Sequence, residues 1–420
     1  MQIRACARLC GFLLVLIAAV TYAGTVLAAD KANQCDALFQ KAGDAASRGG
    51  DDGEFTVAAD GAPSWRPTPN YPSTLRVGIW GDSHTASGSF ADAMAQAWGY
   101  PPEGVRAGHI QAAIGVPGVR LGIARTCLSK GWSLNFAYRS GPQQAGFTST
   151  LVQLAAQDSD ERMVVDFAGS DGTPAPQRLT IHLHRPDPDA TLLLGISING
   201  MPEATPLLLE GDVHALQILP QSEIRTLRLR LIAGQLRITG LEPVYRKPPA
   251  LIVDVFSTPG AQSKGWSQQR VQPIDARYDL VIFQYGTNEA PSDSYRAEDY
   301  AMALRRELKQ FRAVHPQSRC VLIGPPDRVG LTPADKTLDY PARHRSISAV
   351  QARVSPEFRC EYWDWQKAMG GPGSVLAWAR RKEPWAQADL MHLTSEGYAE
   401  SARRFVASIQ RPALRAPQPR

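Results

Sequence analysis

The chain alternates between two patterns of apolar and polar residues. Short, almost continuous apolar runs, typical of parallel strands covered on both faces, lie at 75–80, 251–256, 280–285, 320–323 and 360–363. Apolar residues at helical spacing follow within 89–98, 300–314 and 398–409. This alternation predicts an α/β fold with a doubly wound parallel sheet, in which functional residues lie at the C-terminal ends of the strands.

The region 128–248 has a different pattern of apolar and polar residues. Short β-like runs such as Met163–Phe167 and Leu227–Ile232 are separated by turn residues such as Asn199-Gly200, which is typical of a β-sandwich. We therefore expect an α/β domain that is interrupted by a β-sandwich insertion. The predicted boundaries are a leader at 1–29, an N-terminal extension at 30–72, the α/β domain at 73–127 and 249–410, the insertion at 128–248 and a disordered tail at 411–420.

The N-terminus has the organisation of a secretory signal peptide. Arg4 and Arg8 precede an apolar run at 9–20, and small residues follow up to Ala28-Ala29. The run is too short to span a bilayer comfortably, so we expect cleavage, an exported or periplasmic protein and no stable membrane span. An uncleaved anchor is the alternative. The net charge of +5 over 420 residues gives no case for a nucleic-acid partner, which needs a clustered basic face.

Removal of the leader leaves an even number of cysteines in an oxidising compartment, namely Cys35, Cys127, Cys320 and Cys360. Cys320 and Cys360 each open a predicted strand, and these strands follow one another, so we predict a disulfide between them. Cys35 and Cys127 are left as a second pair. The absence of C-x-x-C spacing argues against zinc or thioredoxin-like chemistry.

Three predicted strand ends carry reactive side chains. Gly81-Asp82-Ser83-His84 follows the first strand, where a turn exposes a Ser hydroxyl as a nucleophile requires. Residues 285–289, Tyr-Gly-Thr-Asn-Glu, follow another strand, and Asn288 has an amide that can donate to a developing oxyanion. Taken alone, the first segment is more typical of an ordinary turn, and the second is as typical of a loop and helix cap.

The third segment, 389–397, precedes the last helix. Asp389 and His392 are three residues apart, so the carboxylate can fix the imidazole tautomer and leave Nε2 free as a base. A lone His near a helix start is more often a surface residue, but its pairing with Asp389 favours the functional interpretation.

Together these segments resemble the SGNH (GDSL-like) hydrolase superfamily, whose four blocks have candidates here in order along 75–111 and 251–409. The resemblance implies that Ser83 is the nucleophile, that His392 is the general base and then the general acid, and that Asp389 orients His392. It implies an oxyanion hole of the Ser83 and Gly260 N–H groups and the Asn288 side chain, with no metal and no cofactor. The second block, Thr258-Pro259-Gly260-Ala261, departs from the usual Asn-containing form.

Details of the blocks look like bacterial peptidoglycan O-acetylesterases: G-D-S-H, G-T-N-E, D-x-x-H-L-T and a β-rich insertion that resembles a carbohydrate-binding module. The resemblance implies an exported serine esterase that removes O-acetyl groups from a carbohydrate polymer, with peptidoglycan the first candidate. An O-acetyltransferase, or an acetylesterase for xylan or a capsule, is the alternative. A non-catalytic glycan-binding protein is the second alternative.

Four further residues have two interpretations each. His182 and His184 share one strand face and offer two metal ligands, but without a third ligand they are expected to be polar-face residues. Trp132 and Trp266 are candidates for stacking on sugar rings, but core packing is the expected role of tryptophan.

Overall fold

The structure is a computed structural model that describes residues 55–62, 65, 71–140, 146–157, 160–167, 174–203, 205–267, 271–274, 276–331 and 338–412. The predicted leader at 1–29, Cys35, most of the predicted N-terminal extension and most of the predicted tail therefore lie outside the described residues. Within the described ranges, no helix combines the length and the apolar character that crossing a bilayer requires.

A parallel sheet forms the centre of the α/β part. Its strand order is β18-β17-β16-β2-β15-β3, and every neighbouring pair is parallel. The strands are β2 (Leu75–Gly81), β3 (Val105–Arg106), β15 (Leu251–Ser257), β16 (Leu280–Gln284), β17 (Arg319–Ile323) and β18 (Cys360–Trp363). The sheet grows outward on both sides of β2, which places the reversal of strand order beside β2, where sites form in such sheets. The predicted doubly wound α/β fold is confirmed.

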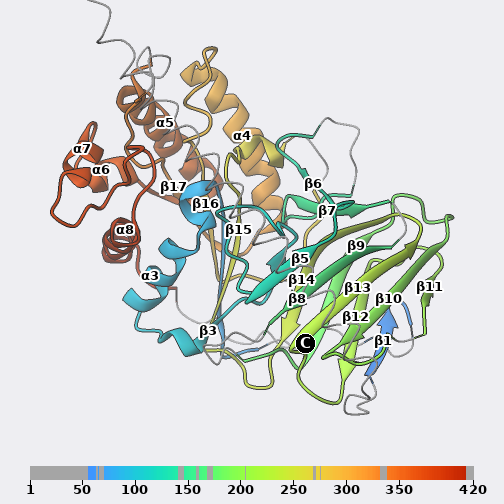
Figure 1. The fold of residues 1–420 in the computed structure, drawn as a ribbon. Helices are drawn as coiled ribbons and strands as arrows, with labels where there is room; N and C mark the ends of the chain where they lie inside the picture. The colour runs from blue at the N-terminus through green and yellow to red at the C-terminus, as the bar shows by residue number, and fades with distance from the viewer. Residues whose placement is uncertain are drawn as a thin grey trace, which may run out of the picture.

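Helices cover both faces of this sheet. The α-helices are α2 (Ser83–Ala86), α3 (Ser89–Ala97), α4 (Ala297–Val314), α5 (Tyr340–Val354), α6 (Trp365–Met369), α7 (Ser374–Ala379) and α8 (Ser395–Ser408), and the 3₁₀-helices are η1 (Pro102–Gly104), η2 (Ser263–Trp266) and η4 (Ser355–Phe358). One core contains α3, α6, α7 and α8, and the other contains α4 and α5. In α4 the predicted apolar stripe of Leu304, Leu308 and Phe311 is buried. Figure 1 shows these helices gathered on one side of the molecule.

Alternation along β2 explains how the two faces are filled. Val77 and Ile79 face the core with α3 and α8, whereas Trp80 faces the core with α4 and α5. A Cβ on Gly78 would lie 2.5 Å from the Trp80 ring, so the glycine makes room for the indole. Trp80 Nε1 donates to the carbonyl of Ser149 at 2.7 Å, and this bond joins the sheet to the inserted region.

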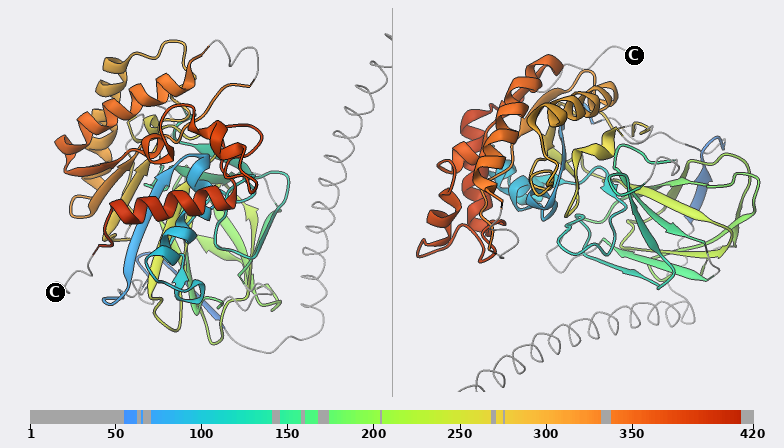
Figure 2. Two further views of the ribbon diagram at one scale, coloured as in Figure 1. Left: turned by 90° about the vertical axis from the view of Figure 1, so that its left-hand side faces the viewer. Right: turned by 90° about the horizontal axis from the view of Figure 1, so that it is seen from above.

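Two antiparallel sheets pack face to face beside the α/β part (Figure 2). The larger has the order β1-β12-β9-β14-β7-β6 with β4 paired to β14, and the smaller has the order β11-β10-β13-β8-β5. Their strands are β1 (Phe55–Ala59), β4 (Ile110–Gln111), β5 (Arg125–Leu128), β6 (Ser133–Phe136), β7 (Val152–Ala156), β8 (Glu161–Asp166), β9 (Arg178–His184), β10 (Leu192–Ile198), β11 (Leu207–Leu209), β12 (Ala215–Pro220), β13 (Thr226–Ala233) and β14 (Leu236–Val244). The predicted β-sandwich insertion is confirmed as a fold.

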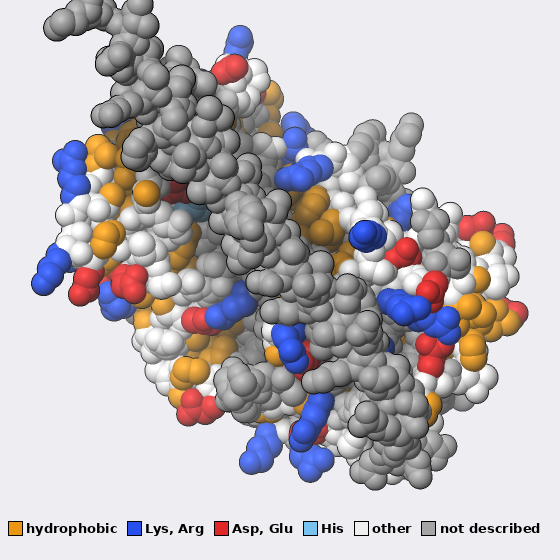
Figure 3. Space-filling view, in the orientation of Figure 1, with side chains coloured by type: hydrophobic (Ala, Val, Ile, Leu, Met, Phe, Trp, Pro, Cys, Tyr) orange, Lys and Arg blue, Asp and Glu red, His pale blue; other side chains and the backbone are white. Residues whose placement is uncertain are grey.

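The antiparallel sheets also include strands that lie before residue 128. β1 pairs with β12, β4 pairs with β14, and β5 pairs with β8. These strands are short and their partners are distant in the sequence, so local patterning did not assign them to the sandwich. Figure 3 shows basic and acidic side chains interspersed over one face of the described surface, across both parts of the molecule.

The predicted Cys320–Cys360 disulfide is confirmed. The two residues are direct partners in the parallel register of β17 and β18, with their Cα atoms 4.5 Å apart. Cys127 is also disulfide-bonded, whereas Cys35, its predicted partner, lies outside the described residues.

Candidate active site

Three neighbouring strands bring the predicted motifs to one edge of the parallel sheet. Gly81 at the end of β2 is opposite Ser257 of β15 on one side and Gln284 of β16 on the other. Because parallel strands end at the same edge, the segments that follow them lie side by side. The Thr258 N–H donates to the Gly81 carbonyl at 3.2 Å, which draws the second block against the first.

Ser83 begins the short helix α2 directly after β2. Asp82 is the N-cap residue, and its Oδ1 accepts the His84 N–H at 2.9 Å. Gln284 Oε1 accepts the Asp82 N–H at 3.2 Å, which ties the turn to β16. Burial raises the pKa of Asp82 to about 7. The turn is therefore held by buried polar contacts, while Ser83 itself remains half-buried.

Ser83, His392 and Asp389 form one hydrogen-bonded relay. His392 Nε2 lies 3.0 Å from Ser83 Oγ, and Nδ1 lies 2.6 Å from Asp389 Oδ2. With the proton on Nδ1 donated to Asp389, Nε2 is free to accept the Ser83 proton. This is the arrangement that activates a serine nucleophile. The side chains of His392 and Asp389 are 27% and 43% exposed, so the relay faces solvent.

The loop that carries Asp389 and His392 folds on itself. Asp389 Oδ1 accepts the N–H groups of Met391 and His392 at 3.0 and 2.9 Å. Leu390 takes a positive φ of 52°, which is uncommon for a non-glycine residue and closes this turn. Burial raises the pKa of Asp389, but the hydrogen bonds from His392 and Met391 and the charge of His392 together outweigh it and hold the pKa below its ordinary value. Asp389 is therefore ionised where it meets the imidazole.

The second and third blocks interlock beside Ser83. Asn288 Nδ2 donates to the Ala261 carbonyl at 2.9 Å, and Gln262 Nε2 donates to the Asn288 carbonyl at 2.6 Å. Gly260 has a φ of +78°, a left-handed conformation that favours glycine. The bond to Ala261 uses one of the two Asn288 amide N–H groups, and no described residue accepts the second N–H.

Glu289 is a residue whose role the sequence did not reveal. Its Oε1 accepts the Ser263 N–H and hydroxyl, each at 2.9 Å, and its Oε2 accepts the Gly286 N–H at 3.0 Å. One carboxyl thus joins the second block to the third. Burial raises the pKa of Glu289. Its place next to Asn288 in the motif was the only available signal.

His84 is a second imidazole at the site. It is fully buried, and its ring centroid lies 5.4 Å from that of His392. Tyr398 Oη lies 3.3 Å from its Nδ1. Burial, with the nearby His392, holds the pKa of His84 well below its ordinary value, so the ring is a neutral support under His392.

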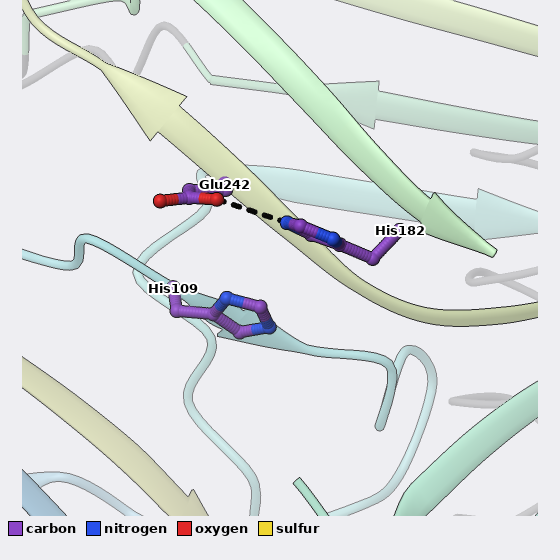
Figure 4. A group of neighbouring side chains, drawn as sticks. All are labelled: His109, His182 and Glu242. Atoms are coloured by element: carbon purple, nitrogen blue, oxygen red, sulfur yellow. Dashed lines mark hydrogen bonds and ion pairs between the residues drawn. The ribbon is translucent and has the colours of Figure 1, made fainter. Parts of the chain in front are cut away.

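The two candidate metal ligands on β9 do not act as a pair. His182 Nε2 lies 2.9 Å from Glu242 Oε2 of β14, and its ring stacks on the His109 ring with centroids 5.1 Å apart (Figure 4). His109, His182 and Glu242 each offer one ligand atom, and these atoms lie within 4.8 Å of one another. His184, the other candidate on β9, does not belong to this group. These contacts describe a hydrogen-bonded His182–Glu242 pair with the His109 ring stacked on it.

The two candidate sugar-stacking tryptophans lie in different surroundings. Trp266 is fully buried and packs edge-on against Trp80 and Phe311, which confirms core packing. Trp132 is half-buried, and its Nε1 donates to the Arg162 carbonyl at 3.0 Å within the antiparallel sheets.

A cavity of about 380 Å³ lies between α3, β15 and the antiparallel sheets, and Ser83, Asp389 and His392 are not among its lining residues.

Comparison with known families adds to this geometry. Residues 240–400 match the GDSL-like Lipase/Acylhydrolase family. The matched segment, which lies mostly in the second part of the α/β domain, is therefore GDSL-like. The matched residues include Gly260, Asn288, Asp389 and His392, whereas the GDSL-like block at Ser83 lies before them and is placed by the fold. No curated protein sequence matches the chain.

Among solved structures, a peptidoglycan O-acetylesterase is similar to this GDSL-like chain, with 23% identity and a TM-score of 0.60. The match covers 80% of this chain and 91% of that one, so it includes the antiparallel sheets as well as the α/β domain. A family two carbohydrate esterase from Clostridium thermocellum in complex with cellohexaose has 9% identity, coverage of 67% and 98%, and a TM-score of 0.28. The likeness to the first structure is one of fold.

Proposed function

We propose that this protein is an exported serine esterase that removes O-acetyl groups from peptidoglycan. The observation that carries the proposal is the relay of Ser83, His392 and Asp389, with distances of 3.0 and 2.6 Å, at the C-terminal edge of the sheet. The match to the GDSL-like family supports acyl-ester chemistry. The fold shared with a peptidoglycan O-acetylesterase supports the choice of glycan, and the leader-like residues 1–29 support export.

The geometry supports a two-step mechanism. Ser83 Oγ attacks the acetyl carbonyl while His392 Nε2 takes the hydroxyl proton, and a bond forms between Oγ and the carbonyl carbon. The oxyanion is met by the N–H groups of Ser83 and Gly260 and by the second N–H of Asn288. His392 then gives its proton to the sugar oxygen as the ester bond breaks. The acetyl group stays on Ser83.

The second step returns the enzyme to its starting state. A water molecule gives a proton to His392 and attacks the acetyl-Ser83 carbonyl. Collapse of this intermediate releases acetate, and Ser83 recovers its proton from His392. Asp389 stabilises the imidazolium in both steps without taking a proton itself. All of these groups are side chains or backbone N–H groups of this chain, and the exposed relay is accessible to an ester on a polymer.

The test is acetate release from O-acetylated peptidoglycan set against acetylated xylan, with p-nitrophenyl acetate as a small reference ester. We expect all three to be cleaved, with the highest kcat/KM on peptidoglycan. Equal or greater kcat/KM on xylan would contradict the choice of glycan. Release of p-nitrophenol only when a sugar acceptor is added, with the acetyl group found on the sugar, would indicate a transferase. Inactivity on all three would indicate a non-catalytic glycan-binding protein.

A further inference from the structure

One turn of the antiparallel region reaches the proposed oxyanion hole. It follows β6 and contains Ala137 and Tyr138, which are buried in the same core as Trp80 of the parallel sheet. Tyr138 Oη donates to the Pro259 carbonyl at 3.1 Å, directly before Gly260. The Ala137 N–H donates to the Leu151 carbonyl at 3.0 Å. The turn is therefore fixed against the second block.

Arg139 is the charged residue at the end of this turn. The Nη2 atom of the Arg139 guanidinium lies 3.4 Å from the position that a Cβ on Gly260 would occupy. The guanidinium carbon lies 5.2 Å from the ring centroid of Phe136 and 5.4 Å from that of Tyr138. Two aromatic faces thus hold the cation beside a proposed oxyanion donor, at distances where cation–π attraction acts.

The charge of Arg139 is not used within the described part of the protein. Its side chain is exposed, and it forms no ion pair with any described Asp or Glu. Its only described hydrogen bond is from its backbone N–H to the Phe136 carbonyl. Two carboxyls of the site are engaged with other groups: Asp389 with His392, and Glu289 with Ser263 and Gly286. A fixed and unpaired cation at the edge of a site is suited to an anionic part of the substrate.

The geometry points to an anion subsite at Arg139, which binds a carboxylate carried by the acetylated sugar unit. This inference rests on the proposed function and names the feature of the substrate that the insertion recognises. A guanidinium presents a planar fork of donors that matches a carboxylate bidentately. Peptidoglycan carries such groups on its muramic acid units, as the lactyl carboxylate where no peptide is attached and in the peptides where they are, whereas acetylated xylan backbones lack them. The antiparallel region would thus supply a specificity-determining residue to the site of the α/β domain.

A pair of small sugars tests the subsite without depending on the polymer. N-acetylmuramic acid carries a carboxylate that N-acetylglucosamine lacks, so we expect the acid to be the stronger inhibitor of p-nitrophenyl acetate hydrolysis. Arg139→Gln is expected to weaken inhibition by the acid about tenfold or more, which is the loss of one hydrogen-bonded charge pair, and to leave the neutral sugar unchanged. Arg139→Lys should keep part of the effect because it keeps the charge.

The polymer provides the second arm. Arg139→Gln should raise KM on O-acetylated peptidoglycan by about tenfold to a hundredfold and leave kcat/KM on p-nitrophenyl acetate and acetylated xylan within about twofold. Arg225→Gln, at an exposed arginine directly before β13, is the matched control and should leave the KM for both polymers unchanged. Peptidoglycan with its peptides removed distinguishes the two sources of carboxylate. Removal of the peptide frees the lactyl carboxylate, so the KM effect of Arg139→Gln should grow if the lactyl group is bound and should disappear if the peptide is bound.

Two results would overturn the subsite. Equal loss of kcat on charged and neutral esters would assign Arg139 to the transition state rather than to the sugar, and equal inhibition of wild type by the two sugars would show that no carboxylate is bound. A failure of the proposed function has a different signature, because wild type itself would then release no acetate from peptidoglycan.

Discussion

Asn288→Ala isolates one donor of the proposed oxyanion hole. The side chain has two N–H groups, of which one donates to the Ala261 carbonyl at 2.9 Å and the other has no acceptor among the described residues. The substitution therefore removes one of three proposed donors and one structural hydrogen bond. Loss of a single oxyanion donor costs about 10²–10³ in kcat, or about 2.7–4 kcal/mol of transition-state stabilisation. The lost bond to Ala261 should cost about 1 kcal/mol of folding stability.

The assay follows kcat and KM with p-nitrophenyl acetate, with circular dichroism and urea unfolding to confirm that the variant is folded. KM should change little, because the donor acts on charge that develops in the transition state. Asn288→Asp is a variant of the same size that lacks the N–H donors, and it should lose at least as much activity. Gln262→Ala is the matched control, since it removes only the bond to the Asn288 carbonyl, 2.6 Å long, and should lose less.

A folded Asn288→Ala enzyme with kcat within about threefold of wild type would refute the oxyanion role, because that loss is far below the effect of a lost donor. The same reasoning fails if Gln262→Ala loses as much as Asn288→Ala. The position of the loop, rather than the donor, would then control the rate.

Asp389, the Cys320–Cys360 disulfide and the buried His315 each give one further prediction. Asp389→Asn should keep the fold, since its side chain is 43% exposed, yet lower kcat by up to about 10⁴ by presenting the wrong His392 tautomer; normal turnover with p-nitrophenyl acetate would contradict this. Replacing both Cys320 and Cys360 by Ser should lower the free energy of unfolding by about 4 kcal/mol, because the bridge spans 40 residues, without changing kcat; a loss below about 1 kcal/mol in urea would contradict the entropic estimate. Burial lowers the pKa of His315 to about 3, so the unfolded chain binds a proton there below pH 6.5 that the folded chain does not, and stability falls as pH falls. His315→Phe should therefore gain about 2 kcal/mol relative to wild type between pH 7 and pH 5 in urea unfolding, and an unchanged difference would rule out this proton linkage.

The α/β part of the fold could be predicted from the sequence because its strands are buried on both faces. Strands buried on both faces produce apolar runs such as 280–285. The glycines and polar residues that follow these runs mark the C-terminal edge of the sheet, where the candidate site residues lie. Parallel strands end together, so Ser83 and Asn288 were expected to meet before any contact was known. The Cys320–Cys360 bridge followed from the same logic, since consecutive strands of this sheet lie side by side.

The contacts between the α/β domain and the antiparallel sheets could not be predicted from the sequence. β4 is only Ile110–Gln111 and finds its partner in β14, so no local pattern marks it as a strand of the sandwich. His109, just before β4, meets His182 and Glu242 only because of that pairing. Arg139 next to Gly260 likewise depends on how the insertion packs on the sheet. Long-range pairing of this kind is decided by tertiary packing rather than by local sequence.

The nucleophile is the central claim, and trapping the acyl-enzyme tests it most directly. Wild type mixed with p-nitrophenyl acetate, quenched in acid within the first turnovers and digested, should yield the peptide that contains Ser83 with the added mass of one acetyl group. Ser83→Ala, folded by circular dichroism, should yield no acetylated peptide and release no acetate from O-acetylated peptidoglycan. An acetyl group on another residue, or an active and folded Ser83→Ala enzyme, would contradict the account.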